Sequence, residues 1–277
     1  MRDLTDYIAK NAGKFVEDLR LLCQQPSISA QKKGIRECVD LLSALMTEIG
    51  IEVKIVPVRA GNPVVFGELQ NKNAEACIGF YNHYDVQPPE PLELWESPPF
   101  SAEVRDGKIF ARGVSDNKGN ILARLEAARA VLEVCGELPV NLKFFFEGEE
   151  EIGSPHLPSF VMENMDLLRA DGYIWEGDGV DRKDRPVITL GAKGILYVEL
   201  RAKGPKRDVH SAEALLVPNP AWRLVWLLST LKGPDEKIKI SGWYDEVVPP
   251  NAIETRMLKE APFEEEENFF QKLKAGL

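Results

Sequence analysis

Four glutamates stand within five residues in the segment FFFEGEEEIGS, at Glu147, Glu149, Glu150 and Glu151. They follow the apolar run at residues 140–146, which is typical of a strand covered on both faces in an α/β sheet. Ligands of such sheets bind at the carboxyl ends of the strands. Because carboxylates held close together repel one another, we expect a divalent cation to neutralise part of this cluster.

A second strand, predicted over residues 76–81, ends in the segment YNHYDVQPP. Its His83 and Asp85 are two residues apart, so both side chains lie on the same side of an extended chain. This arrangement suits a metal-ligating histidine with a carboxylate that orients it. An isolated H-x-D triplet is also common at ordinary turns, so it predicts a metal site only in combination with other acidic residues.

Further acidic residues follow other predicted elements. Asp116 lies just before a helix, where by itself it would be interpreted as an N-cap. Glu176 and Asp178 both follow a short strand at residues 172–175, and strand alternation places them on the same side. Periodicity therefore does not separate these two, but the ends of wound strands converge on one edge, where all these groups would meet. We expect Glu147 and Glu149, in contrast, to be solvated.

The elements that would position these residues alternate between strand and helix. Helical spacing covers residues 4–22 and 35–49, the segment at residues 115–133 leads into a long helix, and the pair Ser154–Pro155 predicts a further helix ending near residue 168. Strands are predicted at residues 51–58, 64–69, 76–81, 140–146 and 172–175. The pattern indicates an α/β fold, a mostly parallel wound sheet with helices on both faces.

The character of the chain changes near Gly194. Strand-like segments at residues 195–200 and 237–244 flank a helix beginning at Asn219–Pro220, and a terminal amphipathic helix follows. We therefore predict a catalytic domain over residues 1–193 and part of a smaller α+β domain over residues 194–277.

Charge and composition restrict the class of function. With 34 basic and 44 acidic residues the net charge is −10, which gives no basic surface for nucleic acid or an anionic membrane. The charged N-terminal segment MRDLTDYIAK does not have the pattern of a signal peptide, so we expect a cytoplasmic protein. The four cysteines form no CxxC pair, and we expect them to be reduced core residues.

Taken in order, the motifs H-x-D, D-x-K-G and E-E-x-G-S, with a further acid after the next strand, resemble the M20 metallopeptidases. The segments HYDVQPP and RDGKIFARGVSDNKG are most similar to the cytosolic nonspecific dipeptidase and carnosinase branch. The resemblance runs from the first helix to about Asn251. It implies a zinc-exopeptidase-like sheet and a smaller lid or dimerisation domain.

The resemblance also implies roles for individual residues. The implied metal ligands are His83, Asp116 as the bridge between two metals, Glu151 and Asp178, with Glu176 as the alternative to Asp178. The implied catalytic residues are Asp85 behind His83, Glu150 as general base and His210 acting across a homodimer. His156, in contrast, is interpreted as a surface or packing histidine. Two Zn²⁺ ions are implied for a full-length site, with Mn²⁺ or Co²⁺ as alternatives.

One family feature is absent from the sequence. The second metal of the family takes a histidine near the C-terminus, but no histidine follows His210, so we expect a C-terminally truncated chain. The function implied is hydrolysis of dipeptides or short peptides with a free carboxylate. The alternatives are an N-acyl amino acid deacylase and a catalytically impaired metal-binding fragment. A small peptide would be the substrate, with no nucleic acid and no membrane as partner.

Overall fold

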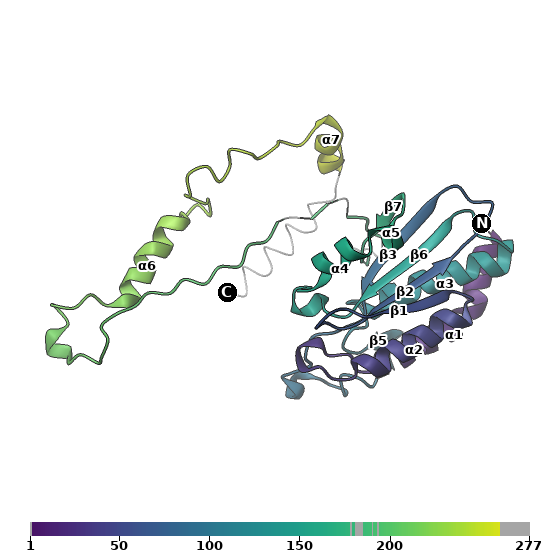
Figure 1. Cartoon of the computed structure of the whole chain (residues 1–277), viewed down its shortest axis with the longest axis horizontal. Coiled ribbons are helices and arrows are strands. Elements are labelled where there is room, and N and C mark those ends of the chain that lie inside the picture. The colour runs from purple at the N-terminus through teal and green to yellow at the C-terminus, as the bar shows by residue number, and fades with distance from the viewer. Residues whose placement is uncertain (1, 178, 181–184, 190, 193, 261–277) are drawn as a thin grey trace. The chain divides into compact units, whose positions relative to one another are not determined.

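The computed structural model describes residues 2–177, 179, 180, 185–189, 191, 192 and 194–260 of the chain (Figure 1). The chain divides into two units, Met1–Ala192 and Lys193–Leu277. Among the described residues, the first unit contains the strands and the second contains none. The catalytic and lid roles assigned from sequence to residues 1–193 and 194–277 stay predictions.

A five-stranded sheet forms the centre of the first unit, in the spatial order β1-β2-β6-β3-β7. Its strands are β1 (Glu52–Val56), β2 (Val64–Leu69), β3 (Cys77–His83), β6 (Asn141–Glu147) and β7 (Gly172–Ile174). A separate two-stranded ribbon pairs β4 (Glu103–Arg105) with β5 (Lys108–Phe110).

The sheet is mixed, whereas a mostly parallel sheet was predicted. β1–β2 and β2–β6 are antiparallel, while β6–β3 and β3–β7 are parallel. The connection from β1 to β2 is too short for a crossover, which requires a dozen or more residues, so these neighbours run in opposite directions. The α/β class itself is confirmed.

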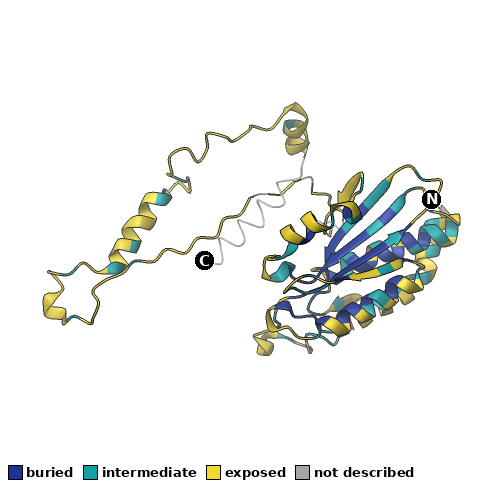
Figure 2. Ribbon diagram, in the orientation of Figure 1, coloured by how far each residue is buried: buried dark blue, intermediate teal, exposed yellow. Residues whose placement is uncertain are grey.

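Helices cover both faces of the sheet (Figure 1). One face packs against α1 (Arg2–Gln24), α2 (Ile35–Glu48) and α3 (Lys118–Cys135), and the other against α4 (Leu157–Glu163) and α5 (Met165–Leu168). In β6, Phe144 and Phe146 belong to the first core and Phe145 to the second, as strand alternation requires. Buried residues accordingly concentrate in the sheet and on the inner sides of the helices (Figure 2). No described helix is long and apolar enough to cross a membrane.

Lys118, the first residue of α3, joins α3 to the end of α1. Its side chain is fully buried, and Nζ donates to the carbonyl oxygens of Leu22 at 3.0 Å and Gln25 at 2.6 Å. A cation at a helix C-terminus satisfies carbonyls that have no partner within the helix. The first turn of α3, which follows Asp116, is therefore fixed against the first helix of the chain.

The helix predicted to begin at Ser154–Pro155 begins instead at Leu157, with His156 as its N-cap residue. Ser154 does not cap it, because its hydroxyl donates to Glu147 Oε1 at 2.8 Å. A 3₁₀ turn at Glu150–Ile152 precedes it. The cysteines are all free, as expected, but only Cys23 and Cys38 lie in the core, while Cys77 is half-buried and Cys135 is exposed.

The second unit contains α6 (Pro220–Leu231) and α7 (Ala252–Glu260). Asn219 caps α6 as predicted, since its Oδ1 accepts from the amide of Ala221 at 2.8 Å. The strands predicted at residues 195–200 and 237–244 do not form; only an isolated bridge joins Lys232 and Ile238. A strand is stable only with a neighbour, and the described residues of this unit supply none. The terminal helix predicted over residues 263–277 lies outside the described residues.

Candidate metal centre

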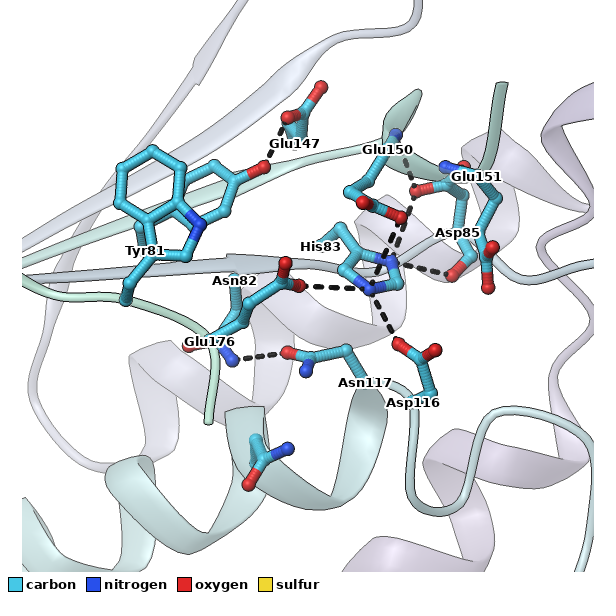
Figure 3. A network of polar contacts seen from close by, with 12 residues as sticks. Tyr81, Asn82, His83, Asp85, Asp116, Asn117, Glu147, Glu150, Glu151 and Glu176 are labelled. Atoms are coloured by element: carbon cyan, nitrogen blue, oxygen red, sulfur yellow. Dashed lines mark hydrogen bonds and ion pairs between the residues drawn. The ribbon is translucent and has the colours of Figure 1, made fainter. Parts of the chain in front are cut away.

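The centre of the site is His83, the last residue of β3, whose side chain is fully buried. In the parallel register of β3 and β6, His83 lies opposite Glu147. The carboxyl ends of the two strands therefore meet, as the sequence predicts. Residues after β6, after β7 and before α3 surround the imidazole (Figure 3).

Three carboxylates approach Nε2 of His83. The nearest atoms are Asp116 Oδ1 at 2.8 Å, Glu176 Oε2 at 3.1 Å and Glu150 Oε2 at 3.8 Å. Burial alone lowers the pKa of His83, but hydrogen bonding to Asp116, Asp85 and Glu176 outweighs it and raises the pKa to about 12. One ring nitrogen carries at most one proton, so it cannot satisfy three carboxylates.

Asp85 lies on the other side of the imidazole and is also fully buried. Its backbone oxygen is 3.1 Å and its Oδ1 3.4 Å from His83 Nδ1. Its two carboxylate oxygens accept from the amides of Glu150 at 3.2 Å and Glu151 at 3.1 Å. Asp85 thus fixes both the imidazole and the start of the Glu150–Ile152 turn.

Glu150 and Glu151 differ in their surroundings. Glu151 Oε2 accepts from Gln87 Nε2 at 2.9 Å, while Glu150 Oε2 lies 3.8 Å from His83 Nε2. Burial raises the pKa of Glu150 to about 7, the repulsion of Glu176, Glu151 and Asp116 adding to it. Burial also raises the pKa of Glu151. Burial thus shifts the pKa values of both carboxyls in the same direction.

Among the residues that the structure describes, two sets of side chains offer ligand atoms within 4.8 Å of one another: His83 with Asp116 and Glu176, and His83 with Glu150 and Glu151. Glu176 Oε2 is buried and lies 3.1 Å from His83 Nε2, a nitrogen that it shares with Asp116. This oxygen, the imidazole and the neighbouring carboxylates together form a group of ligand atoms that suits a divalent cation. The residues present therefore fit a metal.

Glu147 and Glu149 were expected to be solvated, and that expectation is wrong. Both are buried, with 4% and 7% exposure. Glu147 accepts hydrogen bonds from Tyr81 and Ser154, and Glu149 Oε2 lies 2.7 Å from His156 Nδ1. Each carboxylate is thus compensated by local donors, which is how buried charges are tolerated.

Of the remaining predicted residues, the structure brings only one, Glu176, to His83 within the described part of the chain. Glu176 contacts His83, while Asp178, its alternative as metal ligand, lies outside the described residues. His210 belongs to the second unit, is exposed, and accepts from the amide of Ala212 at 3.1 Å through Nδ1. Its role across a dimer stays a prediction.

Sequence reasoning did not identify the polar residues that support the ligands. Buried Asn82 and Asn117 are hydrogen-bonded to each other, and each is the chain neighbour of a ligand, His83 or Asp116. Tyr81 stacks on Trp175 with ring centroids 3.8 Å apart. Adjacency to a predicted ligand is the signal that could have found Asn82 and Asn117.

A cavity of about 790 Å³ adjoins two of the candidate ligands, Asp116 and Glu176. Small-ligand sites commonly measure about 300–1,000 Å³. The remaining lining residues are Ser115, Asn117, Trp175, Gly177, Gly179, Thr189, Gly191 and Ala192. The ligand carboxylates therefore border a space large enough for a small peptide.

Comparison with known proteins agrees with this geometry. The family model described as Peptidase family M20/M25/M40 matches residues 79–275. The chain belongs to this family. The resemblance inferred from the motifs is thereby confirmed.

Similar relatives include a Cys-Gly metallodipeptidase (dug1) of Schizosaccharomyces pombe, 32% identical over 270 residues, which cover 88% of this chain and 55% of the relative. A Beta-Ala-His dipeptidase of Homo sapiens is 36% identical over 190 residues, 68% of this chain and 38% of the relative. The M20 family metallo-carboxypeptidase Sso-CP2 of Sulfolobus solfataricus superposes with a TM-score of 0.79 at 37% identity. That match covers 94% of this chain and 59% of Sso-CP2. The chain thus spans at most about three-fifths of these relatives.

Proposed function

We propose that this chain provides the metal-binding site of a metal-dependent peptidase that hydrolyses dipeptides or short peptides with a free carboxylate. The observation that carries the proposal is the convergence of Asp116 and Glu176 on Nε2 of buried His83, with Glu150 beside them. The names of the M20 relatives, two of them dipeptidases, support the substrate class.

The proposed ligands of one metal are His83, Asp116 and an acid after β7. Glu176 is favoured for that acid because its buried Oε2 lies 3.1 Å from His83 Nε2, whereas Asp178 lies outside the described residues. Asp116 and Glu151 would serve a second metal. A divalent cation held here would polarise the scissile carbonyl and make water a better nucleophile near neutral pH. We propose Zn²⁺, with Mn²⁺ and Co²⁺ as alternatives, since all accept imidazole and carboxylate ligands.

Glu150 is proposed as the general base. Its carboxylate would take a proton from the attacking water and then deliver that proton to the leaving amine, so that the peptide bond breaks as the new carbon–oxygen bond forms. A pKa of about 7 suits both steps, because the group can accept and release a proton at neutral pH. Asp85 would keep His83 and the turn carrying Glu150 in place.

A homodimer through the second unit is also proposed, with His210 contributing to the active site of the partner subunit. Support comes from α6, whose Trp222 and Trp226 are 57% and 62% exposed. Large exposed aromatic side chains are typical of interfaces. A fully active monomer would rule out this role of His210.

The proposed function is tested with the protein stripped by a chelator and then reloaded with Zn²⁺, Mn²⁺ or Co²⁺. We expect hydrolysis of Cys-Gly or β-Ala-His only after reloading, and much slower hydrolysis by the reloaded Glu150→Gln variant. Equal hydrolysis by stripped and loaded protein would refute the proposal. Preference for an N-acetyl amino acid would favour the deacylase, and metal binding without any hydrolysis would favour a catalytically impaired metal-binding protein.

A further inference from the structure

Two side chains of α3 hold the backbone on both sides of Glu176. Asn120 Nδ2 donates to the carbonyl oxygen of Gly177 at 3.1 Å, and Arg124 Nη2 donates to that of Trp175 at 2.7 Å. Asn120 and Arg124 are four residues apart, so they lie on the same face of the helix. The carbonyl groups of the residues before and after Glu176 are therefore both attached to one helix.

The same two side chains reach the neighbours of the other two ligands. Asn120 Nδ2 also lies 3.2 Å from the carbonyl oxygen of Ser115, the residue before Asp116. Arg124 Nη1 donates to the carbonyl oxygen of Tyr81 at 2.9 Å and to Oδ1 of Asn82, the residue before His83. One helix face thus contacts the backbone or side chain next to each of the three ligands.

The chemistry of the guanidinium explains why an arginine is suited to this position. Its planar group has several donors in fixed directions, so one side chain can bridge two separate segments. A lysine ammonium is a single point and cannot span both in the same way. Gly177 permits the approach, because a Cβ at this position would lie 3.3 Å from Arg124 Nη2.

We propose that Asn120 and Arg124 are positioning residues that fix Glu176 as a metal ligand relative to His83 and Asp116. This inference rests on the proposed metal site. In it, Asn120 and Arg124 determine which carboxylate after β7 becomes the metal ligand. Strand alternation cannot choose between Glu176 and Asp178, whereas a clamp on the carbonyls of residues 175 and 177 orients the residue between them. Neither positioning residue needs to touch the metal or the substrate.

The first test compares metal affinity in variants of the whole chain. Stripped protein is titrated with Zn²⁺ in competition with a chromophoric chelator. We expect Arg124→Met and Asn120→Leu to weaken Zn²⁺ binding roughly 10- to 100-fold, the usual effect of removing a residue that orients a ligand. We expect Arg124→Lys to restore only part of this loss.

Arg129→Met is the matched control. It makes the same chemical change on the same helix, but Arg129 is paired with Glu126 at 2.9 Å and Glu48 at 3.4 Å and bonds none of the segments described above. We expect its Zn²⁺ affinity to equal that of the wild type. Melting curves of the metal-free variants show whether each one folds. If Arg124→Met does not fold, the comparison rests on Asn120→Leu.

A double-mutant cycle separates positioning from general destabilisation. If Arg124 acts through Glu176, then Arg124→Met in a Glu176→Gln background should cause little further loss of affinity. The proposal would be overturned if Arg124→Met caused the same loss of Zn²⁺ affinity in the wild-type and Glu176→Gln backgrounds. It would also be overturned if Asp178→Asn lost Zn²⁺ binding while Glu176→Gln retained it. A wild-type chain that binds no divalent metal would instead refute the proposed function and, with it, this inference.

Discussion

Replacing Asp85 by asparagine should destabilise the first unit even when no metal is present. Asp85 is fully buried and accepts hydrogen bonds from the amides of Glu150 and Glu151. Asparagine has nearly the same shape but only one acceptor atom. Its amide group would place a donor against one of these backbone donors.

The magnitude follows from the two hydrogen bonds. A hydrogen bond to a charged group contributes about 1.5–3 kcal/mol and a neutral one about 0.5–1.5 kcal/mol. Asparagine can keep one bond at the neutral strength and loses the other, so we expect a loss of about 2–4 kcal/mol. Since domains are typically stable by about 5–15 kcal/mol, the variant should still fold.

Urea unfolding followed by far-ultraviolet circular dichroism measures this effect. Excess chelator removes any contribution from metal binding, which would otherwise stabilise the wild type selectively. Asp171→Asn is the control, because the Asp171 carboxylate also accepts from a backbone amide, that of Cys77 at 2.7 Å, but is exposed to water. We expect the control to lose no more than about 1 kcal/mol. Equal effects of the two substitutions would refute the reasoning.

Three further predictions concern the carboxylates around His83. Glu150→Gln should lower the rate of peptide hydrolysis about 10²- to 10⁴-fold and leave Zn²⁺ binding nearly intact. Glu151→Gln should weaken Zn²⁺ binding, and a Zn²⁺ titration with the reverse pattern would exchange the roles of the two residues. The proposed second metal would have only Glu151 and the shared Asp116 as protein ligands and no imidazole, so elemental analysis after dialysis should return one tightly held metal per chain, and two would contradict this ligand assignment. Burial raises the pKa of Glu147, and the hydroxyl of Tyr81 counteracts this by stabilising the anion. Tyr81→Phe should therefore lower the free energy of unfolding by about 1–3 kcal/mol at pH values above the folded pKa of Glu147, and by less as falling pH protonates this carboxyl. Urea unfolding at several pH values measures this loss, and a loss that does not depend on pH would refute the reasoning.

The residues around His83 could be anticipated because they follow a general rule of wound sheets. Asp116, Glu150 and Glu176 each stand at the end of a strand or just before a helix, and such ends converge at one edge. Periodicity could not choose between Glu176 and Asp178, and in the proposed site the choice depends on donors that Asn120 and Arg124 bring from another part of the chain.

The burial of Glu147 and Glu149 was missed for a related reason. Charged residues in a run are usually solvated, and only the folded chain brings Tyr81 and Ser154 to the first carboxylate and His156 to the second. The strand expected at residues 195–200 shows the opposite failure. Its alternating pattern is correct for a strand, but the described part of the second unit provides no neighbour with which it could pair.

The insertion of β6 between β2 and β3 has a consequence for the order of events during folding. His83 leaves the ribosome well before β6, and only the docking of β6 brings Glu150 and Glu151 to it. Such non-local pairing is slow, because a long loop must close before any contact forms. A metal that binds only the completed site should therefore slow unfolding and leave the refolding rate unchanged. Stopped-flow traces with and without Zn²⁺ would show this, and faster refolding with metal would mean that the ligands meet early.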